Sequence, residues 1–185
     1  LLASKLGSPA AGAARGLAEA ARNSAGVAVA GALIVVVLAT ILAYSARRSP
    51  SLFQHIALRA ATMGYALPGA VIAIGVLAFA GALGSATGLA ASGLALLLYG
   101  YVARFLTAGF NTIAGGLAQI HPLADDAARV LGAGNAGIVT RVHWPIARGA
   151  FAAGALIVLI DIAKELPATL LLRPFNFETL ATHIY

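Results

Sequence analysis

The chain has 185 residues, of which 61% are hydrophobic and only 10% are charged, and its mean hydropathy is +0.92. Soluble domains carry about 25% charged residues and expose much of their surface to water at this length, so the composition excludes an ordinary soluble domain and favours a membrane protein. The sequence contains no cysteine, which excludes disulfides and thiolate metal sites. The net charge of +6 comes from basic residues near the ends of apolar runs, a pattern typical of membrane topology signals rather than of nucleic-acid binding.

Apolar runs predict four membrane-spanning helices, because a helix needs about 20 predominantly apolar residues to cross a bilayer. The expected spans are 25–46, 62–82, 89–110 and 146–170. The Gly- and Ser-rich stretch 81–88 is expected to form the turn between the second and third spans. Pro68 falls within the second span and is expected to kink it. The high Ala and Gly content favours close helix packing, so the predicted fold is all-α, a polytopic membrane helical bundle.

Basic residues predict the orientation of this bundle. The loops after the first and third spans contain Arg47, Arg48, Arg59, Arg104, Arg129, Arg141 and Arg148. The turn at 81–88 contains no basic residue, so the arginine-rich loops are expected to be cytoplasmic. Segment 1–24 then falls on the non-cytoplasmic side despite Lys5, Arg15 and Arg22, which is explicable if an earlier span sets the topology. We expect the chain to be a fragment, with 173–185 as a periplasmic-side segment before a missing final span.

The longest polar passage in the second half of the chain, 125–145, predicts a helical hairpin. Pro122 suits the first turn of a helix, and Asp125 would lie near the positive end of its dipole. Gly132 and Gly134 are expected to end this helix, because glycine tolerates the left-handed conformation of a helix terminus.

A second short helix is expected at 136–142, with Asn135 as its N-cap. Trp144 and His143 are expected at the membrane interface, and Pro145 is expected to open the last span. The prediction is therefore two helices joined by a glycine elbow along the membrane surface. An ordinary loop with a solvated charged face is the alternative interpretation.

This passage resembles the EAA loop of binding-protein-dependent ABC transporter permeases, whose signature is E-A-A, three residues, G, nine residues and I-x-L-P. The matching positions are Asp126, Ala127, Ala128, Gly132, Val142, Trp144 and Pro145. The spacing matches throughout, with Asp in place of Glu, Val in place of Ile and Trp in place of Leu. The stretches Ala66 to Leu77 (ALPGAVIAIGVL) and Lys164 to Thr182 (KELPATLLLRPFNFETLAT) are similar to the iron(III)-type permeases of this superfamily.

The resemblance implies the fold of a type I ABC importer permease, with a membrane domain at 25–172 and a cytoplasmic coupling loop at 111–145. It implies a multi-pass protein of the bacterial inner membrane that forms the path for a substrate delivered by a periplasmic binding protein. Iron(III) is the favoured substrate; thiamine, polyamine, phosphonate and sulfate or molybdate are the alternatives. The implied partners are an ABC ATPase dimer, that binding protein, a second permease half or homodimer mate, and the lipid bilayer, with no role for nucleic acid.

The sequence lacks a G-x-x-x-x-G-K-[ST] motif, so it does not cradle ATP phosphates in the P-loop manner. We therefore expect a transport subunit that is not itself an enzyme and holds no cofactor, with ATP and Mg in the partner ATPase. The resemblance implies that the EAA residues dock on that ATPase, where Asp126 would pair with a basic residue. A secondary transporter and a non-transport membrane protein, such as an intramembrane enzyme, are the other classes considered.

Asp161, Lys164 and Glu165 form the second group of interest, because charges within membrane helices are costly and usually face the bundle interior. Their spacing of three and four residues predicts a shared helix face, and Pro167 is expected to kink or end the helix just beyond them. They are interpreted either as part of the translocation path or as an internally paired structural cluster. Together they have a net charge of −1, a weak indication of a cationic substrate.

Overall fold

The computed structural model describes residues 9–48, 56, 59, 63–87 and 92–185. The elements are α1 (Pro9–Arg48), the 3₁₀ turn η1 (Gly64–Ala66), α3 (Gly69–Thr87), α4 (Gly93–Ala118), α5 (Pro122–Val130), α6 (Asn135–Ile138), the π turn η2 (Val139–His143), α7 (Trp144–Ala163), α8 (Pro167–Leu172) and α9 (Leu180–Ile184). All of these elements are helical, which confirms the all-α prediction for the described residues.

Four stretches are long and apolar enough to cross a membrane, as the sequence predicted, but their bounds differ from the expected ones. They are Gly12–Arg47, Gly69–Thr87, Gly93–Ala118 and Asn135–Ala163. Residues 9–24, expected as a segment apart from the first span, belong to α1. This stretch is rich in alanine, the residue with the highest helix propensity, so the helix continues beyond the apolar run.

Pro68 sets the start of the second long helix. Its carbonyl accepts hydrogen bonds from the backbone N–H groups of Val71 and Ile72 at 3.0 and 3.2 Å, so it lies just before α3. A proline at this position leaves no backbone donor unpaired within the helix, and the expected kink inside the span is therefore wrong. The expected turn at 81–88 is helical as far as Thr87; the expected span starts at residues 62 and 89 lie outside the described residues.

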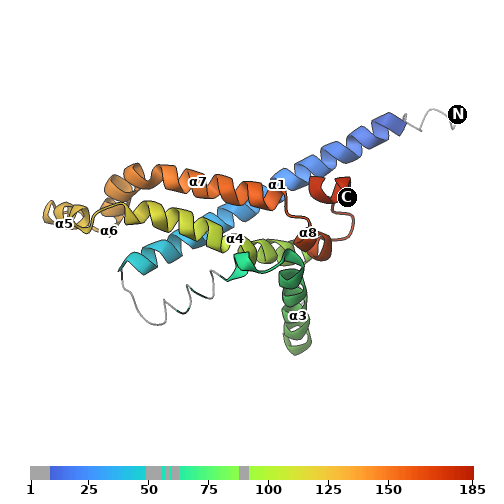
Figure 1. The fold of residues 1–185 in the computed structure, drawn as a ribbon, viewed down its shortest axis with the longest axis horizontal. Helices are drawn as coiled ribbons and strands as arrows, with labels where there is room; N and C mark the ends of the chain where they lie inside the picture. Colours follow the sequence, from blue (N-terminus) through green and yellow to red (C-terminus); the bar gives the residue numbers. More distant parts are fainter. Residues whose placement is uncertain (1–8, 49–55, 57–58, 60–62, 88–91) are drawn as a thin grey trace.

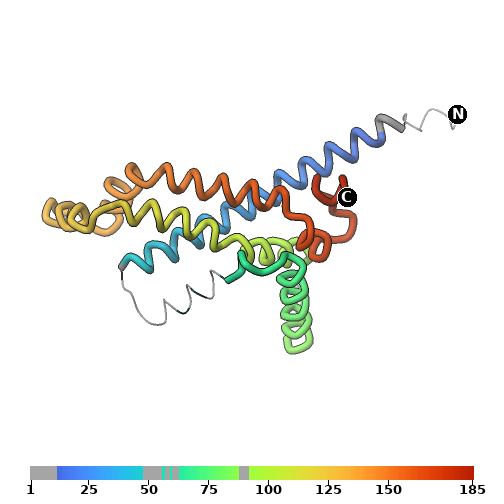
Figure 2. The backbone as a smooth tube through the Cα atoms, viewed as in Figure 1, coloured from blue at the N-terminus to red at the C-terminus, as the bar shows by residue number. Residues whose placement is uncertain are grey.

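Helices α1, α4 and α7 pack against one another as a three-helix core, whereas α3 points away from them and contacts α8 and α4 (Figure 1). The core contains the side chains with the least exposure, among them Val35 of α1, Leu97 and Ile113 of α4, and Val158 of α7. The tube view follows α4 through the hairpin of α5 and α6 into α7, which runs back antiparallel to α4 (Figure 2).

The outward faces of the long helices are apolar. Exposed fractions reach 63% for Leu33 on α1, 61% for Ile74 and 60% for Phe79 on α3, and 58% for Leu156 on α7. Extended apolar surfaces of this kind are rare on soluble monomers. They are suited to contact with lipid chains.

The last long helix ends at Ala163, and Pro167 begins α8. The expectation that the helix is interrupted near Pro167 is therefore confirmed. The end of the span lies at residue 163 and not at the expected residue 170. The following segment, 173–185, lies along the N-terminal half of α1. The backbone N–H of Leu180 donates to Ser24 Oγ at 2.7 Å, and Asn23 Nδ2 donates to the Glu178 carbonyl at 3.0 Å.

Candidate functional site

Residues 122–143, here called the hairpin, lie at one end of the three-helix core (Figure 1). The hairpin begins after α4 and leads into α7, and the C-terminal end of α1 lies beside it. The first helix, α5, begins as the sequence predicted, with Pro122 in its first turn and Asp125 near its positive end. The His121 side chain caps this helix by accepting a hydrogen bond from the Leu123 backbone N–H at 3.2 Å.

Gly132 ends α5 in the left-handed conformation, with φ of 84°. The Gly132 N–H donates to the Arg129 carbonyl and the Ala133 N–H donates to the Ala128 carbonyl, both at 2.9 Å. These two bonds define a Schellman motif, in which glycine occupies the left-handed position without the steric cost of a Cβ. The Schellman motif thus explains why a glycine occupies position 132 of the EAA-like spacing. The predicted glycine elbow is confirmed at this residue.

The second half of the hairpin differs from the prediction. Gly134, with extended backbone, is the N-cap of α6, and Asn135 is its first residue; the expected cap at Asn135 is therefore wrong. The helix does not end before Pro145 either. It passes through the π turn Val139–His143 directly into α7. A π turn widens the helix and commonly marks a functional position; here it comes just before a proline that cannot donate a backbone hydrogen bond.

The residues that match the EAA spacing differ in exposure. Asp126, Ala127, Gly132, Trp144 and Pro145 are exposed, whereas Ala128 and Val142 are half-buried. Asp126 pairs with Arg129 at 2.9 Å within α5. The hairpin also exposes large apolar side chains, namely Leu123 at 66%, Val130 at 87% and Leu131 at 86%.

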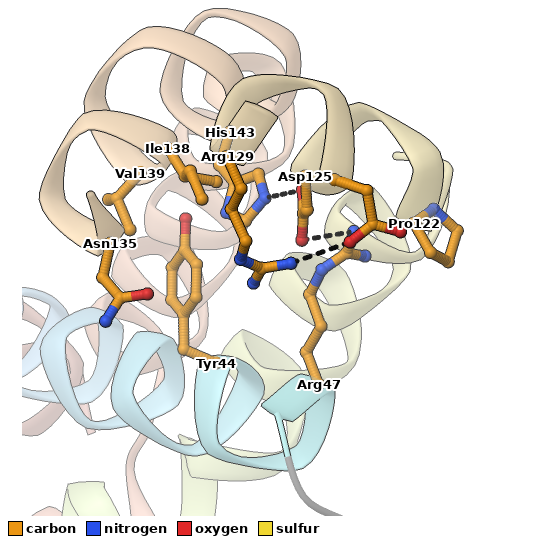
Figure 3. A pocket seen from close by; sticks show the side chains of 10 residues that line it. Tyr44, Arg47, Pro122, Asp125, Arg129, Asn135, Ile138, Val139 and His143 are labelled. Carbon is orange, nitrogen blue, oxygen red and sulfur yellow. Dashed lines mark hydrogen bonds and ion pairs between the residues drawn. The ribbon is translucent and has the colours of Figure 1, made fainter. Parts of the chain in front are cut away.

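Arg47, at the end of α1, connects the hairpin to the membrane helices (Figure 3). Its guanidinium donates to the carbonyls of Leu117 and Ile120 at 2.8 and 3.0 Å, which satisfies acceptors at the end of α4. It also pairs with Asp125 of α5 at 3.3 Å. From the sequence, Arg47 was predictable only as a topology signal at the end of the first span. The structure places it at the junction of α1, α4 and α5.

His143 completes this contact, which we call the brace: Tyr44, Arg47, Asp125 and His143. His143 Nε2 lies 2.7 Å from Asp125 Oδ1, and its ring stacks on Tyr44 with centroids 5.4 Å apart. His143 is 4% exposed, so its side chain faces other protein residues, and its expected level at the membrane interface stays a prediction. Burial raises the pKa of Asp125, but the hydrogen bonds and charges of His143 and Arg47 outweigh it, and the pKa lies below its ordinary value. The brace lines an open pocket of about 630 Å³ under the hairpin.

We expect Asp125→Asn to weaken the attachment of the hairpin by about 1.5–3 kcal/mol at pH 7, because hydrogen bonds to charged groups contribute about that much. The folded pKa of Asp125 is depressed. Its contribution is therefore present above the unfolded pKa of about 4 and is lost as the pH falls through the lower folded value. Hydrogen exchange of the α5 amides between pH 3 and 7, corrected for the intrinsic exchange rate, measures the opening free energy and its acid dependence.

Asp126→Asn is the matched control for this prediction. Its ion pair with Arg129 is exposed on both sides, at 63% and 55% of the side-chain surface. Such pairs contribute about 0.3–0.5 kcal/mol on a helix. Equal protection losses in the Asp125 and Asp126 variants would show that the brace does not hold the hairpin.

The second predicted group lies near the other end of α7. Lys164 Nζ pairs with Asp161 Oδ1 at 2.7 Å, and the hydroxyl of Tyr65 donates to the other oxygen of that carboxylate at 3.3 Å. Glu165 instead pairs with Arg104 of α4, whose Nε lies 3.0 Å from Glu165 Oε2. Both carboxylates are buried, at 5% and 7% exposure, whereas the Lys164 side chain is 69% exposed.

Glu165 lies beyond the end of α7, so the expected shared helix face of Asp161 and Glu165 is wrong. The chain turns before Pro167, and Glu165 Oε1 accepts the Ala168 N–H at 3.2 Å at the start of α8. A Cβ on Gly69 would overlap Glu165 Oε1, so glycine allows the close approach of α3. With Arg104 included, the group has two positive and two negative charges and no net charge, which removes the electrostatic indication of a cationic substrate.

Neither site contains a metal-binding cluster: among the described residues, no three His, Asp, Glu or Cys side chains group closely enough to hold an ion. A comparison of the sequence with protein-family models and with curated proteins found no match. The geometry of the hairpin and of the long apolar helices is therefore the basis on which a function is proposed.

Proposed function

We propose that the chain is a membrane-spanning permease subunit of an ABC importer and that the hairpin docks on a separate ATPase subunit. The observation that carries the proposal is the hairpin itself: a helix, a Gly132 elbow and a second helix continuous with α7, projecting from one end of a bundle of apolar helices. A short rigid element joined directly to a long membrane helix can transmit a displacement. The EAA-like spacing of Asp126, Gly132 and Pro145 supports the same interpretation.

The surface of the hairpin is suited to a protein partner. Val130 and Leu131 are among the most exposed large apolar residues of the chain, and Asp126 and Arg129 lie beside them. An apolar centre with a polar rim is typical of protein interfaces. We propose that this end faces the cytoplasm of a bacterial inner membrane, that a second permease half completes the path, and that a periplasmic binding protein delivers the substrate, with iron(III) favoured. The role of Asp161, Lys164 and Glu165 as part of the path stays a prediction.

Co-purification tests this proposal directly. A tagged chain extracted from its native membrane should retain a protein that carries a P-loop ATPase motif, identified by mass spectrometry. Leu131→Asp should remove most of that protein, because it places a charge in the apolar centre of the interface. Ile184→Asp is the matched control, since Ile184 is also exposed, at 78%, but lies in α9 at the other end of the core. Equal retention by both variants would contradict docking through the hairpin.

A further inference from the structure

An apolar groove of about 780 Å³ runs between α1 and α7 near the hairpin end. Val37 and Ile41 line it from α1 and are 56% and 59% exposed, so the groove opens on the outer face of the bundle. Gly149 and Ala152 line it from α7, and a Cβ on Gly149 would meet no atom within 4 Å. Small residues on one helix opposite branched residues on the other therefore form the hollow.

The groove is apolar except at its hairpin end. The Thr40 hydroxyl that lines it donates to the Val36 carbonyl at 2.6 Å and is satisfied within α1. Arg148 is the only charged lining residue among those described, and it is exposed. Its guanidinium forms no hydrogen bond or ion pair with any residue that the structure describes. The groove thus joins a long apolar surface to one unneutralised cation.

The dimensions of α7 place this cation within reach of lipid headgroups, because Arg148 is roughly 6 Å from the start of the helix and a long arginine side chain can extend to the interface. Helix α7 has 20 residues, which corresponds to roughly 30 Å, about the thickness of the hydrocarbon core. Trp144 and Arg148 lie at its hairpin end beside Tyr44 of α1, and Trp and Tyr are enriched at this depth. Ala155, the deepest lining residue of α7, lies roughly 16 Å along the helix from Trp144 and roughly 10 Å from Arg148. The groove therefore extends from the headgroup level to about the middle of the bilayer.

We propose that this groove is a binding site for an anionic phospholipid, with one acyl chain between α1 and α7 and the phosphate at Arg148. The chain and the headgroup match the two parts of the groove, because lipid tails fill apolar hollows and phosphate pairs with guanidinium. This inference requires only the membrane location of the proposed function and is independent of ATP-driven transport.

A second copy of the chain fits the groove less well, because it offers no free carboxylate at the level of Arg148. The sequence contains six acidic residues, and five of them form ion pairs with basic side chains of their own chain. The sixth, Glu19, precedes Tyr44 by 25 residues along α1, which places it roughly 37 Å from the hairpin end of the groove.

The single tryptophan of the chain, Trp144, lines this groove and reports on its occupant. The full chain is incorporated into vesicles in which brominated phosphatidylglycerol or brominated phosphatidylcholine replaces part of an unbrominated phosphatidylcholine matrix. Bromine quenches the fluorescence of a nearby indole, so the quenching curves give the relative affinity of the groove for the two lipids. We expect about a fivefold preference for phosphatidylglycerol, equivalent to about 1 kcal/mol per basic residue at the membrane surface.

Arg148→Gln should remove this preference, whereas Arg141→Gln should retain it. Arg141 is also exposed and without a partner among the described residues, but it does not line the groove. Gly149→Leu should also abolish the preference by filling the hollow. Gly115→Leu makes the same change on an open face of α4, where a Cβ likewise meets no atom within 4 Å, and should behave as the unmodified chain.

Flotation of the vesicles, scored first, separates the two proposals: a chain that does not float with lipid contradicts the membrane location itself. For a chain that floats, equal quenching by the two lipids would overturn the lipid site. Equal losses in the Arg148 and Arg141 variants would also overturn it, because they would indicate general surface attraction. Weak quenching by both lipids, together with a cross-linked dimer through Gly149→Cys, would assign the groove to a second copy instead.

Discussion

Glu165→Ala should lower the free energy of unfolding by about 3–5 kcal/mol, which is the cost of leaving one member of a buried ion pair without its partner. Glu165 is 7% exposed and pairs with Arg104 at 3.0 Å. Its other oxygen accepts the Ala168 N–H at the start of α8. The substitution would leave the guanidinium of Arg104 without a carboxylate partner where α3, α4 and α8 meet, although Arg104 keeps its hydrogen bond to the Leu67 carbonyl. Unfolding by sodium dodecyl sulfate in mixed micelles measures the loss.

Two comparisons give this prediction its controls. Glu178→Ala removes a carboxylate that is 48% exposed beside Arg173, and it should cost less than about 1 kcal/mol. Arg104→Met combined with Glu165→Leu replaces both charges by apolar groups and should be more stable than Glu165→Ala alone. A Glu165→Ala variant as stable as Glu178→Ala would mean that the pair does not hold the helices together.

Gly116→Leu should destabilise the bundle by about 3 kcal/mol, at the upper end of overpacking costs. A Cβ on Gly116 would overlap the Cβ of Ala150, which places this glycine at the contact between α4 and α7. Both atoms belong to rigid helices, so neither can move aside without separating the helices. Gly115→Leu is the matched control on the adjacent residue, where a Cβ meets no atom within 4 Å. The same detergent titration should distinguish the two variants; equal midpoints would contradict the observed packing.

The first half of the hairpin could be predicted from the sequence because its signals are local. Pro122, Asp125 and Gly132 each act through backbone geometry within a few residues, and the structure places all three as expected. The number of long apolar helices was predictable for a similar reason, since length and hydropathy define them. The start of α3 was not predictable, because the sequence around Pro68 is compatible both with a kink inside a span and with a helix that begins after the proline.

The residues that hold the elements together were not predictable, because their partners are distant in the sequence. Arg47 and Asp125 are 78 residues apart, and no periodicity connects them. Arg104 belongs to α4 and Glu165 to the turn between α7 and α8, so the two meet only once these elements have packed. An arginine next to an apolar run indicates a span boundary. The sequence pattern is the same whether the arginine faces lipid headgroups or caps a neighbouring helix, so the pattern does not distinguish these two roles.

The brace gives the proposed coupling a physical route. A force on α5 would reach α1 and α4 through Asp125 and Arg47, and a force on α6 would reach α7 through the continuous helix at η2. The three core helices therefore all connect to the hairpin. An ATPase that moved the hairpin would thereby act on the whole bundle.

Uptake and ATP hydrolysis, measured together in vesicles that contain the chain, its ATPase and its binding protein, test the central claim most directly. With radioactive iron(III) as the first probe, the unmodified chain should couple the two activities. Gly132→Leu should uncouple them, because a side chain at φ of 84° strains the elbow. Gly134→Leu, at a residue with extended backbone and no atom within 4 Å of its Cβ, should remain coupled. Unchanged coupling in Gly132→Leu would contradict the account.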